Sequence, residues 1–157
     1  MRMQPQRSAE FLIRRARREE IPRIREVLDE ADREHMARLH EEVVEEWKQS
    51  IEEALASPDG ELIVAVSGGT IVGVVQFYSD ASASTAERWP AGSSCIRLLG
   101  VLPAHRRRGI GAALLKECIA RARKYGTQII YPLLRAWHRY NMLISHDFLV
   151  ARTLQTT

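Results

Sequence analysis

The sequence has only two cysteines, Cys95 and Cys118, among its 157 residues. Two isolated thiols are too few for a disulfide framework or a zinc site. Apolar runs are also short: LIVAV, at 62–66, falls far below the roughly 18 residues needed to span a bilayer. The first eleven residues contain no apolar segment, so we expect no signal peptide and no membrane contact. These absences favour a protein of the reducing cytoplasm.

The composition is that of an ordinary globular domain, with 45% hydrophobic and 27% charged residues. The length is sufficient to bury one core. We expect residues 1–10 to be disordered and residues 11–157 to form a single domain. Within that domain, residues 132–157 have a divergent pattern that predicts no clear element.

Charge is distributed in blocks along the chain. Residues 26–60 carry twelve acidic and three basic side chains, whereas residues 96–157 carry eleven basic and two acidic ones. Such asymmetry suggests a molecule that handles an anion on one side and a cation on the other. Two solvated helical faces would produce the same pattern, so both interpretations stay open.

Hydrophobic periodicity predicts alternating strands and helices. The SGGT stretch between two Val/Ile-rich runs indicates a β-hairpin. Gly126 is placed to end a helix. The predicted strands are 11–16, 61–67, 70–78, 94–103 and 127–131; the predicted helices are 18–31, 34–56 and 108–125, and the predicted loop is 79–93.

The most informative stretch is HRRRGIGAALL at 105–115. It lies between a predicted strand and a predicted helix, whose first-turn N–H groups attract anions. Gly109 and Gly111 let the backbone approach a ligand closely. Arg106, Arg107 and Arg108 add donors that suit phosphate. The stretch therefore predicts a pyrophosphate cradle, although it matches neither the Walker A loop nor the G-x-G-x-x-G fingerprint.

The longer segment LGVLPAHRRRGIGAALL, at 99–115, resembles motif A of the GNAT superfamily of acyl-CoA-dependent N-acetyltransferases. That motif has a strand ending in V-x-P, then R-x-x-G-x-G/A, then an amphipathic helix. The resemblance covers about residues 11–131. It implies an α+β fold with a central mixed, mostly antiparallel twisted sheet flanked by helices. It also implies a splayed strand at 94–103 followed by the helix 108–125.

The same resemblance implies acetyl-CoA as cosubstrate. Loop residues would bind the pyrophosphate, and backbone groups of Leu99 and Val101 would pair with the pantetheine arm. The amide of Leu99 would also stabilise the oxyanion. Gly100 fits a bulge or a close approach, but an ordinary buried strand is the alternative. The implied cofactor-binding residues are Leu99, Val101, Arg106, Arg107, Arg108, Gly109, Ile110, Gly111 and Ala112, with no metal.

The implied reaction is direct attack of a primary amine on acetyl-CoA, in which an acid can protonate the leaving thiolate. By resemblance Tyr140 is the candidate acid, although the match is poor and an ordinary core or surface tyrosine fits slightly better. Acidic residues of helix 34–56 could line an acceptor groove, or simply be solvated. His105 lies beside the cradle, and Trp89 could cap the acceptor site. The acidic residues in question are Glu41, Glu42, Glu45 and Glu46.

Three functions are therefore compared. The first is an N-acetyltransferase acting on a small-molecule or peptide amine, and the second is a non-catalytic acyl-CoA-binding GNAT domain. A basic nucleic-acid-binding module is third, and it is disfavoured because the arginines gather at a glycine loop. An incomplete sheet edge after Pro132 would also favour a homodimer.

Overall fold

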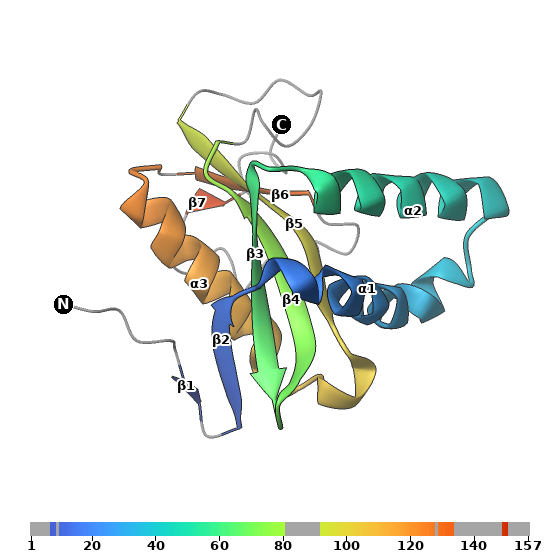
Figure 1. Ribbon diagram of the computed structural model, residues 1–157. Helices are drawn as coiled ribbons and strands as arrows, with labels where there is room; N and C mark the ends of the chain where they lie inside the picture. Colours follow the sequence, from blue (N-terminus) through green and yellow to red (C-terminus); the bar gives the residue numbers. More distant parts are fainter. Residues whose placement is uncertain (1–6, 9, 81–91, 128, 134–148, 151–157) are drawn as a thin grey trace.

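A sheet of seven strands, in the order β1 to β7, forms the centre of the molecule (Figure 1). This computed structural model describes residues 7–8, 10–80, 92–127, 129–133 and 149–150. The strands are β1 (Arg7–Ser8), β2 (Phe11–Arg15), β3 (Gly60–Ser67), β4 (Thr70–Tyr78), β5 (Ser93–Val101), β6 (Ile129–Leu133) and β7 (Leu149–Val150). The helices are α1 (Ile21–Met36), α2 (Glu41–Ala56) and α3 (Ile110–Lys124), with short 3₁₀ turns at Arg18–Glu20 and Pro103–His105.

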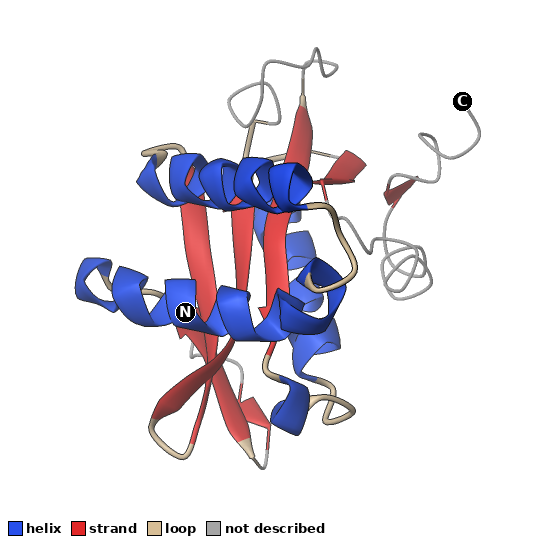
Figure 2. Cartoon of the chain, turned by 90° about the vertical axis from the view of Figure 1, so that its right-hand side faces the viewer, coloured by secondary structure: helices blue, strands red, loops and turns tan. Residues whose placement is uncertain are grey.

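Helices cover both faces of this sheet. Strands β1 to β5 pair antiparallel, whereas β5, β6 and β7 are parallel. Helices α1 and α2 lie side by side across one face, and α3 covers the other (Figure 2). The expected mixed, mostly antiparallel sheet flanked by helices is confirmed.

The β3–β4 hairpin forms where the glycines predict it. Gly68 and Gly69 have φ values of 58° and 79°, which are the left-handed conformations that a tight two-residue hairpin turn requires. The strands that flank them run over Gly60–Ser67 and Thr70–Tyr78. The predicted bounds therefore hold to within one residue.

The start of the second helix differs from the prediction. We predict a helix over 34–56, but α1 continues to Met36 and α2 begins only at Glu41. The extended His40 caps α2, with its Nδ1 accepting from the Glu42 N–H at 3.5 Å. The turn between the helices contains no Gly, Pro or Ser, so the composition carries no signal for this break.

Short segments at both ends of the chain add to the sheet. Arg7 and Ser8 pair with β2 inside the stretch 1–10, for which we predict disorder, and residues 1–6 and 9 lie outside the described part. Strand β6 runs through Pro132 to Leu133, beyond the predicted end at 131. The parallel strand β7 then borders β6.

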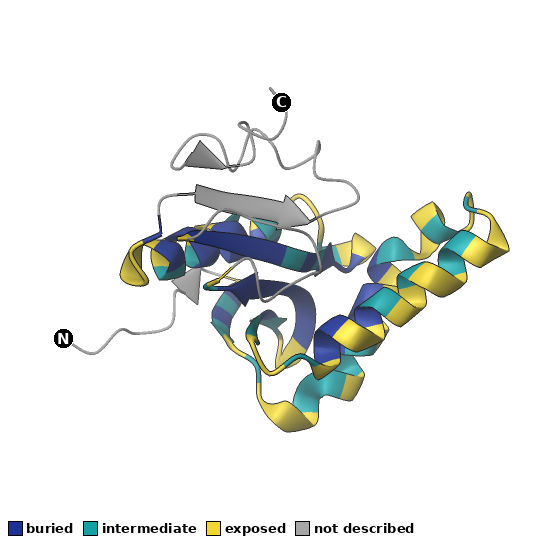
Figure 3. Ribbon diagram, turned by 90° about the horizontal axis from the view of Figure 1, so that it is seen from above, coloured by how far each residue is buried: buried dark blue, intermediate teal, exposed yellow. Residues whose placement is uncertain are grey.

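The core lies between the sheet and its helices. Side chains of α1 and α3 that face the sheet are buried, while the outer sides of α1 and α2 are exposed (Figure 3). The buried residues of α3 include the inward set that its periodicity predicts, namely Leu114, Leu115, Cys118, Ile119 and Ala122. Gly126, with a φ of 75°, follows α3 as the expected terminator.

Polar contacts attach the second half of α2 to its neighbours. Arg25 of α1 makes a two-pronged ion pair with Glu52, at 2.5 and 3.0 Å. Ser50 accepts a 2.9 Å bond from Arg97 of β5. The buried Gln76 of β4 donates to the Ala54 carbonyl at 2.7 Å. These contacts hold α2 against both α1 and the sheet.

Candidate active site

The described pairing between β5 and β6 ends halfway along β5. The described parallel pairs run from Ser93↔Ile129 to Arg97↔Leu133. Just beyond, three steps along β5 (Arg97 to Gly100) oppose two along β4, which defines a bulge, and Leu98 has a φ of 56°. A bulge bends its strand. Among the described residues, the outer edge of β5 therefore has no strand partner past Arg97.

Backbone groups of Leu99 and Val101 lie along this open edge. Leu102 N–H donates to the Val72 carbonyl of β4 at 2.9 Å, so Leu102 and, by alternation, Gly100 face β4. The residues between them face the other way. Arg106 Nε, which reaches Val101 O at 3.3 Å, approaches from that open side. The two residues predicted to pair with a pantetheine arm thus expose their backbone groups where such an arm could lie.

Gly100 is required by the close approach of α1. A Cβ at this position would lie 3.2 Å from Leu28 Cδ2 and 3.3 Å from Ala31 Cβ. The bulge is nearby, at Leu98, and not at the glycine itself. The alternative that the sequence leaves open, an ordinary buried strand in which Gly100 relieves crowding, therefore accounts for these contacts.

The loop that follows β5 adopts left-handed conformations at two positions. Arg107 has a φ of 64° and Gly109 a φ of 80°. Gly109 is the N-cap of α3, which starts at Ile110, two residues later than predicted. A left-handed residue cannot belong to the helix, so it sets this boundary. Open space surrounds the Cβ position of Gly109.

A run of unpaired amides lines this loop. The first amide of α3 with a backbone acceptor is that of Ala113, which donates to Gly109 O at 3.0 Å. Within the described part of the chain, the N–H groups of residues 107–112 have no protein acceptor. Left-handed turns and a helix N-terminus orient such donors toward an anion. The residues of the predicted cradle therefore fit a pyrophosphate.

Two of the three loop arginines bind the protein itself. Arg106 donates to the carbonyls of Ala31, at 2.7 Å, and Val101, which ties the loop to α1 and β5. Arg108 pairs with Glu10 at 3.1 Å and with the Nδ1 of His105 at 2.5 Å. Both guanidinium groups thus hold the loop in shape, a role that the sequence analysis missed.

Arg107, in contrast, is exposed and has no polar partner among the described residues. Its charge is available to a ligand beside the amides. Ile110 is 1% exposed and its Cγ2 lies 3.0 Å from where a Cβ at Gly73 would stand, so its side chain packs α3 on β4. Gly111 and Ala112 are half-buried on the first turn. Ile110, Gly111 and Ala112 therefore contribute only backbone groups to the cradle.

Candidates for proton transfer are placed unevenly. Tyr140 and Trp89 lie outside the described residues. The four acidic residues of α2 that could line an acceptor groove are exposed, as expected of a solvated face. They are Glu41, Glu42, Glu45 and Glu46. Burial raises the pKa of the Cys118 thiol, which excludes a reactive thiolate there. Within the described ranges, no three His, Cys, Asp or Glu residues are arranged to hold a metal ion.

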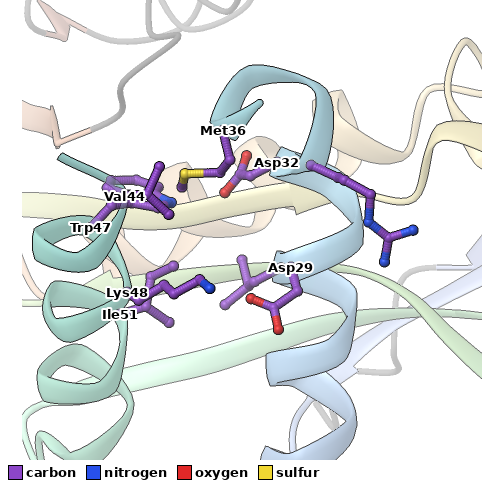
Figure 4. Close-up of a pocket in the computed structure, with 9 residues that line it drawn as sticks. Asp29, Asp32, Met36, Val44, Trp47, Lys48 and Ile51 are labelled. Carbon is purple, nitrogen blue, oxygen red and sulfur yellow. The ribbon is translucent and has the colours of Figure 1, made fainter. Parts of the chain in front are cut away.

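A pocket lined by described residues was not predicted from the sequence. It lies between α1 and α2 and measures about 280 Å³ (Figure 4). We call it the helix pocket. Its lining residues come from both helices, and no single stretch of sequence identifies them. They are Leu28, Asp29, Asp32, Arg33, Met36, Val44, Trp47, Lys48 and Ile51.

Solved structures share this fold at low identity. A GNAT acetyltransferase from Brucella melitensis, in complex with acetyl-CoA, has a TM-score of 0.58 and 24% identity over 85% of this chain and 82% of its own. The PaiA N-acetyltransferase from Thermoplasma acidophilum, in complex with coenzyme A, has a TM-score of 0.55 and 20% identity over 74% of both chains. These similarities support the fold alone.

The length of the chain differs from that of some relatives. A Pyrococcus horikoshii protein with an acetyltransferase assignment has a TM-score of 0.51 and 20% identity over 79% of this chain, but this chain spans only 38% of it. No curated protein sequence matches at a significant level.

Among the described helices, none has the length and apolar character to cross a membrane.

The family assignment rests on a match across most of the chain. Residues 22–142 match the model of the acetyltransferase (GNAT) family. This range contains both N-terminal helices, the hairpin, the open edge of β5, the glycine loop and α3. The chain therefore belongs to the GNAT family of acetyltransferases.

Proposed function

We propose that this acetyltransferase transfers an acetyl group from acetyl-CoA to a primary amine of a small molecule or peptide, by direct attack. One observation carries the proposal: the edge of β5 that has no strand partner among the described residues ends next to the unpaired amides of residues 107–112. The extended edge of β5 and the curved loop thus follow each other along the chain. Each offers backbone N–H groups that have no acceptor among the described residues. The first suits an arm that pairs like a strand, and the second suits a pyrophosphate.

The residues of this site divide by role. The amides of residues 107–112 hold the pyrophosphate, and Arg107 adds a positive charge. Arg106 and Arg108 position the loop through their contacts with Ala31 and Glu10. Leu99 and Val101 pair with the pantetheine arm. The amides of residues 107–112 have no acceptor in the described protein, whereas the carbonyl of Val101 already accepts from Arg106.

Acetyl-CoA supplies the acetyl group as an activated thioester. The N–H of Leu99 donates to the carbonyl oxygen and stabilises the negative charge that develops there during attack. Holding the amine against the open edge accounts for further rate enhancement through proximity. Tyr140 remains the predicted acid for the leaving thiolate, and the bulk solvent can accept the proton of the ammonium group.

Thiol release from acetyl-CoA, measured with a panel of primary amines, tests this function. We expect amine-dependent release and a product heavier than the amine by one acetyl group. Gly109→Glu should abolish it because the new carboxylate would occupy the open space of the cradle and repel pyrophosphate. Cofactor binding without turnover on any amine would instead support a non-catalytic acyl-CoA-binding domain.

A further inference from the structure

The helix pocket has an apolar interior of small-molecule size. Leu28 and Ile51 are buried at its base, and Met36, Val44 and Trp47 are half-buried around it. Figure 4 shows Met36 of α1 pointing toward Val44 and Trp47 of α2. A volume of 280 Å³ equals that of about nine water molecules. The pocket therefore suits an apolar group of about the size of one aryl ring with a short chain.

The pocket lies directly behind the open edge of β5. Leu28 lines the pocket and also contacts the strand, since its Cδ2 would lie 3.2 Å from a Cβ at Gly100. Gly100 stands between Leu99 and Val101, whose backbone groups line the proposed thioester site. Leu28 is thus shared by the pocket and by the strand residue that lies between Leu99 and Val101.

Asp32 is the half-buried charge of this pocket. It follows Leu28 by one helical turn and is adjacent to Ala31, which also packs on Gly100. Its side chain points toward the space between the helices (Figure 4). The other charged lining residues, Asp29, Arg33 and Lys48, are exposed, so solvent screens them more strongly. The partly buried carboxylate therefore sets the preference for a cation.

Two polar contacts join the walls of the pocket to each other and to the sheet. The Arg25–Glu52 ion pair joins α1 to α2, and the Arg97–Ser50 bond joins α2 to β5. Both contacts lie on the half of α2 that follows Trp47. A pocket whose helices are already tied together needs little rearrangement to bind a ligand.

Resting on the function proposed above, we propose that the helix pocket binds the acceptor, a small primary amine with one apolar group of aryl size, and that Asp32 attracts its ammonium group. The ammonium releases one proton to solvent before attack. The nitrogen then forms a bond to the carbonyl carbon, and the C–S bond breaks. The nitrogen loses a second proton and the departing thiolate gains one. The products are an amide and a thiol.

Steady-state kinetics with two amines test this inference. We use 2-phenylethylamine as the apolar probe and 2-(2-aminoethoxy)ethanol as the polar one. Wild type should prefer the apolar amine in kcat/KM by about tenfold or more. Trp47→Ala and Asp32→Asn should each raise KM for 2-phenylethylamine about tenfold, with a smaller change in kcat. Asp59→Asn, an exposed control that removes the same charge outside the pocket, should change KM by less than about twofold.

A direct binding measurement separates this inference from the proposed function. Ligand-observed NMR should detect 2-phenylethylamine on wild type, with and without coenzyme A, and should detect none on Val44→Trp, which fills the pocket. Failure to bind, equal use of both amines, or equal effects of Asp59→Asn and Asp32→Asn would overturn the inference. A wild type that binds the amine but not acetyl-CoA would overturn the proposed function instead.

Discussion

Leu28 of α1 lies against the backbone of Gly100 of β5, so that a Cβ on Gly100 would lie 3.2 Å from Leu28 Cδ2. The contact couples the helix that lines the pocket to the strand edge that we assign to the thioester. A Cβ at position 100 therefore requires that Leu28 and Ala31, or the strand itself, shift by a few tenths of an ångström.

Gly100→Ala should therefore disturb the acceptor more than the cofactor. We expect the free energy of unfolding to fall by about 1 kcal/mol through overpacking. The KM for the amine should rise, whereas the loop at 107–112 keeps its affinity for acetyl-CoA. Urea unfolding measures the stability, steady-state kinetics the KM for the amine, and calorimetric titration the affinity for acetyl-CoA. A selective loss of acetyl-CoA affinity would show that the strand, not α1, absorbs the strain.

Arg106 and Arg107 are neighbours with opposite expected phenotypes. Arg106→Ala removes the donors to Ala31 and Val101 and should lower the free energy of unfolding by about 1–2 kcal/mol. Arg107→Ala removes an exposed charge, so stability should stay within about 0.5 kcal/mol. Its affinity for acetyl-CoA should fall severalfold, and more at low salt than at high salt. These roles would be contradicted if thermal unfolding showed Arg107→Ala destabilised and Arg106→Ala not. They would also be contradicted if titration showed that only Arg106→Ala loses affinity for acetyl-CoA.

Glu20 links the start of α1 to β2 and makes stability depend on pH. Hydrogen bonds from Arg14, at 2.7 and 2.8 Å, lower the pKa of the Glu20 carboxyl to about 2. Because the folded pKa lies below the unfolded value, the contribution is full above about pH 4.5 and is lost as the pH falls toward 2. Glu20→Gln should cost about 1–2 kcal/mol at pH 7.

The test is urea unfolding of Glu20→Gln and wild type across this pH range. The difference between the two proteins should shrink between pH 4.5 and 2. A constant difference would show that the carboxylate charge is not the source of the stabilisation.

Tyr140→Phe examines the predicted acid. Removing a proton donor to the leaving thiolate should lower kcat by about 10²-fold while the Kd for acetyl-CoA stays unchanged. Tyr125→Phe is the matched control, because Tyr125 is 51% exposed near the far end of α3 and donates to Glu61. Equal kcat values for the two variants would remove Tyr140 from the mechanism.

The elements that sequence reasoning predicts well have strong local signals. Gly68 and Gly69 require a left-handed turn, and Gly126 provides the same signal at the end of α3. The break between α1 and α2 has no such signal, because Ala37 to His40 are all compatible with a helix. Tertiary contacts that draw α2 onto β4 and β5 decide its position.

The candidate site could be predicted only in part for a similar reason. Gly109 and its neighbours form one short stretch with a recognisable order, so the sequence alone predicts the cradle. The roles of Arg106 and Arg108 depend on Ala31 and Glu10, which are distant in the chain. The helix pocket likewise joins Asp32 to Trp47 across a turn that the sequence does not mark.

Calorimetric titration with acetyl-CoA tests the central claim most directly. Gly109→Glu and Gly126→Glu place the same residue at glycines with φ values of 80° and 75°, both surrounded by open space, at opposite ends of α3. The strain and charge are therefore matched, and only the first lies in the cradle. We predict micromolar binding by wild type and Gly126→Glu and none by Gly109→Glu, with circular dichroism unchanged. Equal binding by both variants would contradict the assignment of the loop to acetyl-CoA.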